Sequence, residues 1–331
     1  LLPLDDSPLR ARVLARLAAA RQPDADVDAP IAIARDAIAM ARRFDDPALL
    51  LDVLHMALGA LSDFAPLAER LPLEEEAARL ALAAGDRPRA LRAFVRLALD
   101  HARGGDVRGF ERAVTAYAAQ ATATQQPRFL WLVPMLRSMH ALWRGRWDDA
   151  DRLEAEAMAI RERAPDDGLD YAMTRAWCRH HLRGEPHELT AHEVTRMTGD
   201  HPVYAGILRT YSAARNGAPV APLDPDAASS MLALVHGDAN GGVMLGEIVW
   251  GSRDRALAPA ITRALARHEG HALMVTGIGY AIFDVVDRTL MRMAALAGRW
   301  DDAERHATAA LALCERLGAA PIAALVRASH A

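Results

Sequence analysis

The chain has 331 residues, of which 52% are apolar and only 5% are aromatic. The apolar residues are mostly Ala, Leu and Val, a composition that favours closely packed helices over sheets. The sequence contains no lysine, so it can neither form a Schiff base nor complete the GxxxxGK[ST] loop of nucleotide hydrolases. The net charge is −4 and arginines are interspersed with acidic residues, so we expect no direct binding of nucleic acid.

Cysteine usage and hydropathy bear on where the protein is found. Cys178 and Cys314 are the only cysteines, and they are far apart in the sequence. We expect packed thiols in a reducing compartment. No run of about 18 apolar residues is free of charges, so we expect no membrane span. Residues 1–6 lack both a signal-peptide pattern and an initiator Met. We expect a cytoplasmic protein, and either a piece of a longer chain or a stand-alone relative.

Helix start signals recur along the chain, because Ser7-Pro8 and Asp46-Pro47 each precede an apolar run with helical period. In the first run, Leu9, Val13 and Leu17 follow at spacing four and predict a buried face. The predicted helices cover residues 7–21, 29–43, 47–61, 64–71, 73–84, 87–103, 107–122, 128–144, 147–162, 168–183, 187–198, 202–215, 225–236, 240–250, 254–269, 275–297, 300–316 and 321–329.

Prolines and turn words refine this prediction. Pro72 is expected to split one helix, and Pro134 and Pro259 are expected to kink the helices that contain them. No alternating strand pattern with hairpin-turn words occurs, so we expect no appreciable sheet.

A six-residue word, Gly-Arg-Trp-Asp-Asp-Ala, occurs twice, at Gly145–Ala150 and Gly298–Ala303. A repeated word that contains Trp indicates a repeat protein. We expect an all-α fold, a right-handed α-solenoid of about eight helical hairpins, as one domain over residues 1–331. The stretch 216–225, rich in Pro, Gly and Ala, is where this domain would break into two lobes. The expected turn glycines are Gly105, Gly145, Gly184, Gly217, Gly251 and Gly298.

The repeated word, with the small residues that follow it, resembles the second half of a tetratricopeptide repeat (TPR). In that family a Gly closes the first helix, an aromatic residue follows two residues later, and small residues seat the second helix. The matching positions here are Gly145, Trp147, Ala150 and Ala157, and again Gly298, Trp300, Ala303 and Ala310. The other turns match less well, since Gly184 lacks the aromatic residue.

A wider resemblance rests on ordered short words at residues 6–18, 42–50, 238–240 and 286–319. In this order they are similar to the repeat region of bacterial multidomain signal-transduction ATPases, in which a helical arm follows a nucleotide-binding module. Cyclase or LuxR-type DNA-binding domains often occupy the other ends. The resemblance implies a role in sensing and protein interaction, and it brings no catalytic residues with it.

Histidines gather at residues 178–192, which suggests a metal site at first reading. His187 and His192 are five residues apart, about 140° around a helix, so they do not share a face. His180 and His181 are adjacent and diverge. We therefore expect no metal site and no cofactor. Further along, Asp284 and Asp287 lie one helical turn apart. We expect solvated or Arg-paired carboxylates there, with an acid–base pair as the alternative.

Aromatic and arginine residues on the first helices of the hairpins are the candidate binding surface. Arg175, Trp177, Tyr204 and Arg209 occupy consecutive first helices at similar depth, and we expect them to lie together in a groove. Aromatic rings beside an Arg suit an acidic peptide or a carboxylated effector. Packing between repeats is the alternative role for the same residues.

The two Trp residues of the repeated word have a structural interpretation. Trp147 and Trp300 are expected to wedge between helices, so that truncating either to Ala would cost roughly 3–5 kcal/mol.

Together these features predict a non-catalytic sensor or interaction domain of a bacterial regulatory ATPase. Its concave face would bind a protein segment or a small effector and report to an attached or separate ATPase or output domain. The alternatives are a stand-alone adaptor of the same fold, and an all-helical enzyme with a pocket inside the superhelix.

Overall fold

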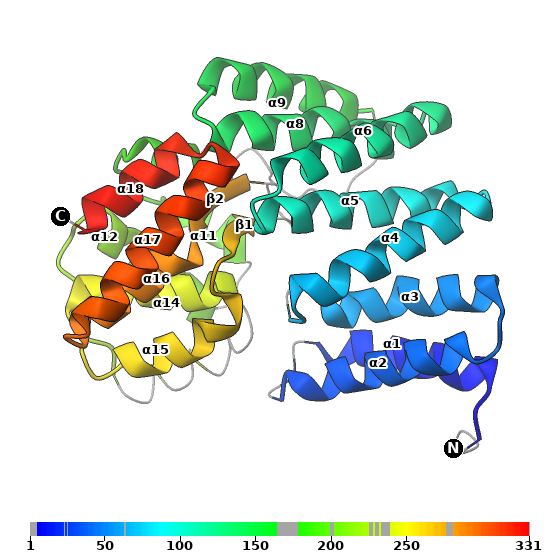
Figure 1. Ribbon diagram of the computed structural model, residues 1–331. Helices are drawn as coiled ribbons and strands as arrows, with labels where there is room; N and C mark the ends of the chain where they lie inside the picture. Colours follow the sequence, from blue (N-terminus) through cyan, green and yellow to red (C-terminus); the bar gives the residue numbers. More distant parts are fainter. Residues whose placement is uncertain are drawn as a thin grey trace. The chain divides into compact units, whose positions relative to one another are not determined.

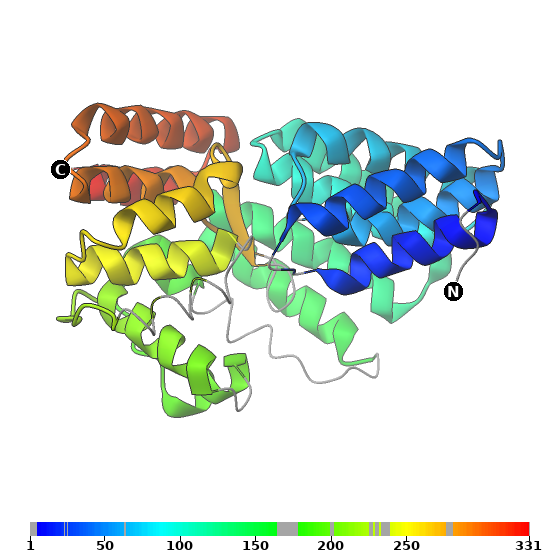
Figure 2. The same ribbon diagram turned by 90° about the horizontal axis from the view of Figure 1, so that it is seen from below.

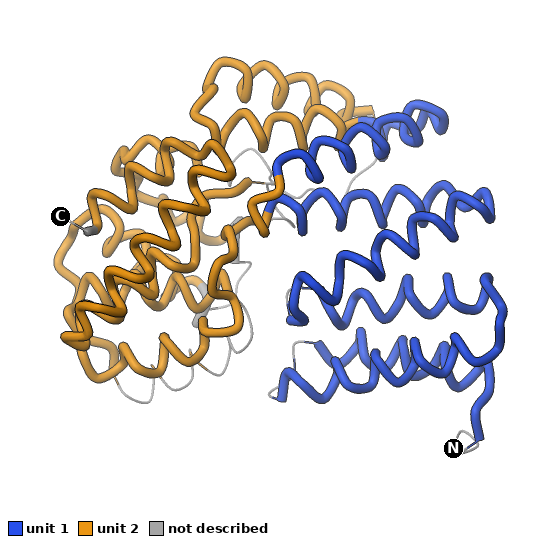
Figure 3. The backbone as a smooth tube through the Cα atoms, in the orientation of Figure 1, with its two compact units in different colours: residues 1–102, 107–130, 236–238 blue, residues 103–106, 131–235, 239–331 orange. Residues whose placement is uncertain are grey.

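The computed structural model describes residues 5–22, 24, 26–62, 64–163, 178–198, 202–224, 228, 232, 239–275 and 281–330. The chain forms two compact units (Figure 3). The first unit contains residues 1–102, 107–130 and 236–238, and the second contains residues 103–106, 131–235 and 239–331. The stretch 216–225, where the composition predicts a break, lies inside the second unit.

The first unit is built of helices that pack on their sequence neighbours (Figure 1). Helix α1 packs on α2 and α3, and α3 also packs on α4. Its helices are α1 (Pro8–Arg21), α2 (Asp28–Arg42), α3 (Pro47–Leu61), α4 (Leu67–Ala83), α5 (Arg87–Arg103), α6 (Val107–Thr124) and α7 (Pro127–Leu130).

The predicted helix starts of this unit are confirmed at α1 and α3. The Ser7 hydroxyl accepts the Arg10 N–H at 3.2 Å, and the Asp46 carboxylate accepts the Ala48 N–H at 2.9 Å. In both cases a Pro follows the capping residue, where its missing N–H costs the helix nothing.

The buried face of α1 differs from the prediction. Leu9 and Leu17 are 61% and 45% exposed, whereas the face toward α2 and α3 consists of alanines. Small side chains allow these helices to approach closely, and the larger leucines remain outside that contact. The fully buried alanines are Ala11, Ala15 and Ala18.

The second unit contains the remaining helices and a strand pair. Helices α14 and α15 pack on each other and on α16, which in turn packs on α17 (Figure 2). The elements are α8 (Leu132–Trp143), α9 (Trp147–Arg161), α11 (Ala191–Thr198), α12 (Pro202–Arg215), α14 (Ala239–Ser252), α15 (Ala258–Leu265), the 3₁₀ turn η1 (Ala266–His268), β1 (Ala272–Val275), β2 (Ala281–Val285), α16 (Val286–Leu296), α17 (Trp300–Leu317) and α18 (Ala320–His330).

The strand pair corrects the predicted helix 275–297. Strands β1 and β2 are antiparallel, with Ala272 opposite Val285 and a register shift between Leu273 and Met274. Every residue of β2 is buried. A short, mostly apolar run suits a fully buried strand as well as a helix, and periodicity cannot separate the two; here Asp284 is the one charged residue of β2. Gly277 and Gly279 also weaken a helix over this run.

Two of the three prolines behave differently from the prediction. Helix α4 continues through Pro72, so the loss of one N–H does not split it. Pro134 lies in the first turn of α8, and Pro259 in the first turn of α15. The helix predicted over 128–144 is interrupted at Trp131, between α7 and α8, so the expected disturbance at Pro134 is present. At Pro259 no kink forms, because a first-turn proline removes an N–H that has no helical partner and so begins the helix.

Both cysteines lie in the second unit, and both are buried and unpaired with each other. Burial raises the pKa of the Cys314 thiol to about 12. Across the described ranges no helix is both long and apolar enough to cross a bilayer. Helices make up most of the described residues, and β1 and β2 are the strands among them.

Candidate functional site

One helix ending recurs through the described part of the chain. A residue with positive φ closes the helix; its own N–H donates three residues back, and the following N–H donates five residues back. The left-handed conformation favours glycine because a side chain adds strain there. Glycine occupies this position at Gly85, Gly145, Gly184, Gly217, Gly298 and Gly318.

The end of α14 has the same hydrogen bonds but no glycine. Arg253, with φ of 57°, donates to the Trp250 carbonyl, and Asp254 donates to the Val249 carbonyl. Gly251, which we predicted to be this turn, instead lies within α14, where an added Cβ would be 3.1 Å from the Cβ of Ala214. Its role is close packing, and Arg253 takes the turn.

The two Trp residues of the repeated word have different surroundings. Trp300 is 70% exposed, so the prediction that it wedges between helices is wrong. It stands at the first position of α17 and its ring remains outside the helix contact. Trp147 is half-buried, with the Arg183 guanidinium 4.9 Å from its ring centroid. The small residues of the word pack as expected, since Ala150 and Ala303 are both buried.

An open pocket of about 1180 Å³ lies in the second unit, between the end of α14, α16 and the start of α17. We call it the arginine–tryptophan pocket. Three of its wall residues are arginines, and Glu304 is the acidic wall residue. Its wall includes Trp250, Arg253, Arg255, Met291, Arg292, Trp300 and Glu304.

The Trp250 ring contacts two of these arginines. The Arg253 guanidinium lies 4.8 Å from the Trp250 ring centroid, and the Arg292 guanidinium lies 5.2 Å from it. A cation over an indole face is attracted by the ring quadrupole, and the ring restrains the guanidinium. Both guanidiniums are therefore held at the pocket. The N–H groups of the exposed Arg253 remain able to bind an anion, whereas Nη1 of Arg292 is bound to Glu247 and its Nε is buried, which leaves Nη2.

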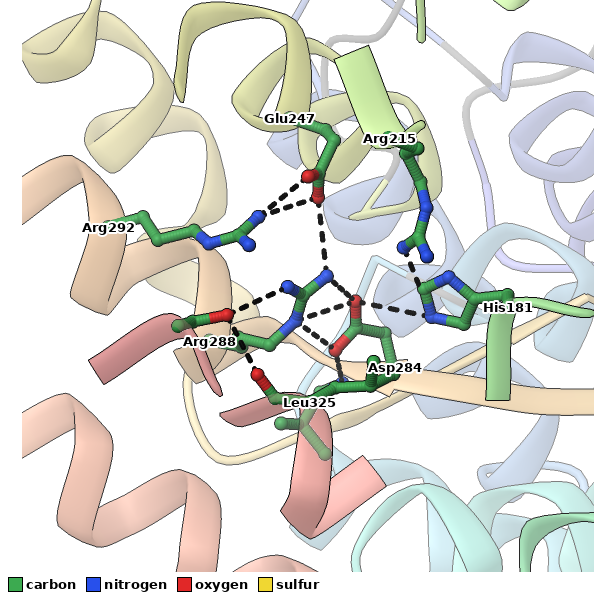
Figure 4. Close-up of polar contacts among 9 residues, drawn as sticks. His181, Arg215, Glu247, Asp284, Arg288, Arg292 and Leu325 are labelled. Carbon is green, nitrogen blue, oxygen red and sulfur yellow. Dashed lines mark hydrogen bonds and ion pairs between the residues drawn. The ribbon is translucent and has the colours of Figure 1, made fainter. Parts of the chain in front are cut away.

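A buried ion network lies behind Arg292 (Figure 4). Nη1 of Arg292 donates to both carboxylate oxygens of Glu247, at 2.8 and 2.7 Å. Arg288 lies between two carboxylates: its Nη2 is 3.2 Å from Glu247 and 2.6 Å from Asp284. Arg288 also donates to the Ser329 hydroxyl at 3.1 Å, which ties α18 to the network.

The charges in this network are fixed by their neighbours. Burial alone would raise the pKa of Glu247, but the positive charges of Arg288 and Arg292 lower it to about 2. Burial alone would lower the pKa of Arg288, but the charges of Asp284 and Glu247 raise it above its ordinary value. His181, 3.8 Å from Asp284, has its pKa lowered by burial and by the charges of Arg215 and Arg288, so it is neutral.

A second pocket of about 210 Å³ borders the same network and shares Arg292 and Ser329 with the larger one. Arg215 and Glu185 are among its other wall residues. The Nε of Arg292 is buried and has no hydrogen-bond partner in the described part of the chain. Arg292 is thus anchored by Glu247, lies over Trp250, and faces both pockets.

The four residues predicted to line a groove are only partly among the described residues. Arg175 and Trp177 lie outside the described residues, and for Tyr204 only the backbone, in α12, is described. Arg209 is exposed on α12. Two further arginines take part in ion pairs, since Arg288 binds Asp284 and Arg179 binds Asp151.

Three residues from separate segments could hold a metal ion. Glu269, Asp287 and His306 place their ligand atoms within 4.8 Å of one another. Nδ1 of His306 is 2.8 Å from Asp287, and Nε2 is 3.0 Å from Arg305, which also pairs with Glu269. The polar atoms therefore have partners without an ion, and the Arg305 charge opposes a cation. Asp284 is paired with Arg288, as the favoured interpretation of the sequence expected, and Asp287 contacts His306, so the two carboxylates do not form an acid–base pair with each other.

No sequence motif predicts the arginine–tryptophan pocket. Arg253 and Arg292 are 39 residues apart, and only the packing of α14 on α16 brings them to the same ring. One signal was available: Gly251 is followed by Ser-Arg-Asp, so this turn departs from the repeated word.

Comparison with known proteins does not assign the chain to a family. No protein-family model matches the chain, and it matches none of the curated proteins either.

Proposed function

We propose that this chain is a non-catalytic sensor or interaction domain that binds an anionic partner in the arginine–tryptophan pocket. The observation that carries the proposal is the pair of guanidiniums, from Arg253 and Arg292, over the single indole of Trp250. Arg255 adds a third positive charge to the same wall, against the single carboxylate of Glu304. Such a wall suits carboxylate or phosphate groups, which guanidiniums bind through paired hydrogen bonds.

The network behind the pocket supports a binding role. Arg292 is held by two hydrogen bonds to Glu247, so it loses little further freedom when an anion arrives. The low pKa of Glu247, about 2, keeps this anchor ionised at neutral pH. A preorganised cation of this kind favours binding because its ordering cost is met during folding.

In this proposal the hairpins form a TPR-like right-handed solenoid, and the chain is the arm of a bacterial regulatory ATPase. The ordered words shared with that family support the assignment, as does the recurring helix ending. Ligand binding would shift the equilibrium between helix arrangements and so act on an attached output domain. A stand-alone adaptor differs only in its flanks, so a GxxxxGK[ST] motif upstream in the reading frame separates the two.

The test is a calorimetric titration of the whole chain with two anionic probes. These are citrate and a ten-residue peptide of alternating Glu and Phe, with a peptide of alternating Arg and Phe as the charge control. At least one anionic probe should bind, more weakly in high salt. Losing one charged hydrogen-bond donor in Arg255→Ala should weaken it about tenfold.

Arg263 on α15 provides the matched control, because it is an exposed arginine of the same unit outside the pocket wall. Arg263→Ala should leave the affinity unchanged. If neither anionic probe binds, or if Arg255→Ala binds as tightly as the wild type, the proposed function is wrong.

A further inference from the structure

The helix ending that closes α14 differs from its six counterparts in one residue. The two hydrogen bonds are the same in all seven, and in the other six the left-handed position is glycine. A side chain in the left-handed conformation brings Cβ against the following carbonyl oxygen, which disfavours it relative to glycine. Arg253 is therefore placed where glycine would relieve backbone strain.

The compensation within the chain is small. Arg253 is exposed, and its guanidinium contacts the face of Trp250 at 4.8 Å. Among the described residues no carboxylate forms an ion pair with it. A cation–π contact at an exposed site is weak. Strained residues that local stability does not explain are typical of binding and catalytic sites.

The chemistry of the wall defines the ligand. Arg253 and Arg255 both line the pocket on the segment that follows α14, and Arg292 lines it from α16. The pocket, at about 1180 Å³, exceeds the usual range for small-molecule sites, and the exposed ring of Trp300 leaves its rim open. Several separated cations beside Met291 and Trp300 suit a chain that alternates acidic and apolar side chains.

We propose that Arg253 is retained as a ligand contact, and that the ligand is an acidic peptide segment with apolar residues between its carboxylates. This inference rests on the proposed function and names its partner class. The left-handed turn directs the guanidinium along the Trp250 face, where it binds a carboxylate of the segment together with Arg255. With Arg253 the end of α14 is less stable than it would be with glycine, and in return the arginine contributes to ligand binding.

Two substitutions at the same position separate binding from stability. Arg253→Gly removes the guanidinium and the backbone strain, and Arg253→Ala removes the guanidinium and keeps the strain. Both substitutions should lower the affinity for the alternating Glu-Phe peptide about tenfold, as expected for the loss of one charged contact. The melting temperature should be unchanged or higher for Arg253→Gly. For Arg253→Ala, which loses only the weak cation–π contact, it should fall by no more than about 2 °C.

The reciprocal control is Gly298→Arg, which places arginine in the equivalent turn before α17 and should lower the melting temperature. The inference is overturned if Arg253→Gly binds the peptide normally, or if it melts more than about 2 °C below the wild type. Tighter binding of citrate than of the peptide would also overturn it, in favour of a small effector. In each of these cases, loss of binding in Arg255→Ala would still uphold the proposed function.

Discussion

Glu74 in the first unit and Glu247 in the second are both buried glutamates on helices, with exposed fractions of 1% and 7%. Their pKa values shift in opposite directions. Burial and the negative charge of Asp100 raise the pKa of Glu74 well above its ordinary value. Arg288 and Arg292 outweigh the effect of burial at Glu247 and lower its pKa to about 2.

The difference lies in whether the nearby arginines hydrogen-bond to the glutamate itself, since Arg70 and Arg96 both act on Glu74 through their charge but neither donates a hydrogen bond to it. In the first unit Nη2 of Arg70 donates to Asp100 at 2.8 Å, so Glu74 shares a cluster with a second acid. In the second unit Glu247 accepts hydrogen bonds from two arginines. Burial alone therefore does not decide the charge of a glutamate here. The raised pKa keeps Glu74 protonated to higher pH, whereas the lowered pKa keeps Glu247 ionised within its ion network.

The largest effect should come from removing the central cation of the second unit. Arg288→Ala leaves Asp284 buried without its main partner and should cost about 3–5 kcal/mol in the free energy of unfolding, measured by urea denaturation. Arg42→Ala, which breaks the exposed pair with Glu76, is the matched control and should cost less than about 1 kcal/mol. Similar losses in both variants would refute the role of burial.

Glu247→Gln should cost roughly 3 kcal/mol at pH 7, which corresponds to a pKa lowered from 4.5 to about 2. The ionised carboxylate stabilises the fold above the unfolded pKa, and that stabilisation is lost as the pH falls through the folded pKa. Urea titrations from pH 7 down to pH 3 should therefore show the wild type converging on the variant. A difference that does not change with pH would contradict the pKa assignment.

Glu74→Gln should show the opposite dependence on pH. The folded wild type keeps its proton while the unfolded chain releases it above its ordinary pKa of 4.5. The wild type should then lose stability relative to the variant as pH rises, by at most about 1.4 kcal/mol per pH unit, until the folded pKa is passed. The same titrations measure this, and a wild type that gains on the variant with rising pH would reverse the comparison.

The smallest effect should be at an exposed pair of the first unit. Arg35 donates to both oxygens of Glu69, but the two side chains are 54% and 27% exposed. Arg35→Ala should cost no more than about 1 kcal/mol, and the loss should shrink in high salt. A loss that is insensitive to salt would show that geometry matters more than solvent here.

The helices of both units could largely be predicted from the sequence, because their signals are local. Ser7 and Asp46 cap helices where expected, and the Gly145 and Gly298 turns follow from the repeated word. Local signals failed where two structures satisfy one pattern. The apolar run at Ala281–Val285 suits either a strand or a helix, and burial between other elements decides in favour of the strand.

The pocket could not be predicted because it depends on helix packing. Trp250 and Arg292 belong to different helices with no shared motif, and their contact follows from the packing of α14 on α16. The repeated word at Trp300 favoured a different role for this pocket residue, because the TPR resemblance implied a packed ring, whereas the ring is exposed.

The two buried cysteines are probes of local opening in this molecule. Cys178 and Cys314 are buried, and the thiol of Cys314, on α17, has its pKa raised to about 12. A thiol reagent attacks the thiolate, so in the closed molecule Cys314 is protected by both access and protonation. The rate at which such a reagent labels Cys314 therefore reports how often α17 separates from its neighbours. An occupied pocket that steadies α17 would slow this labelling, so occupancy can be timed without a tag or an added chromophore.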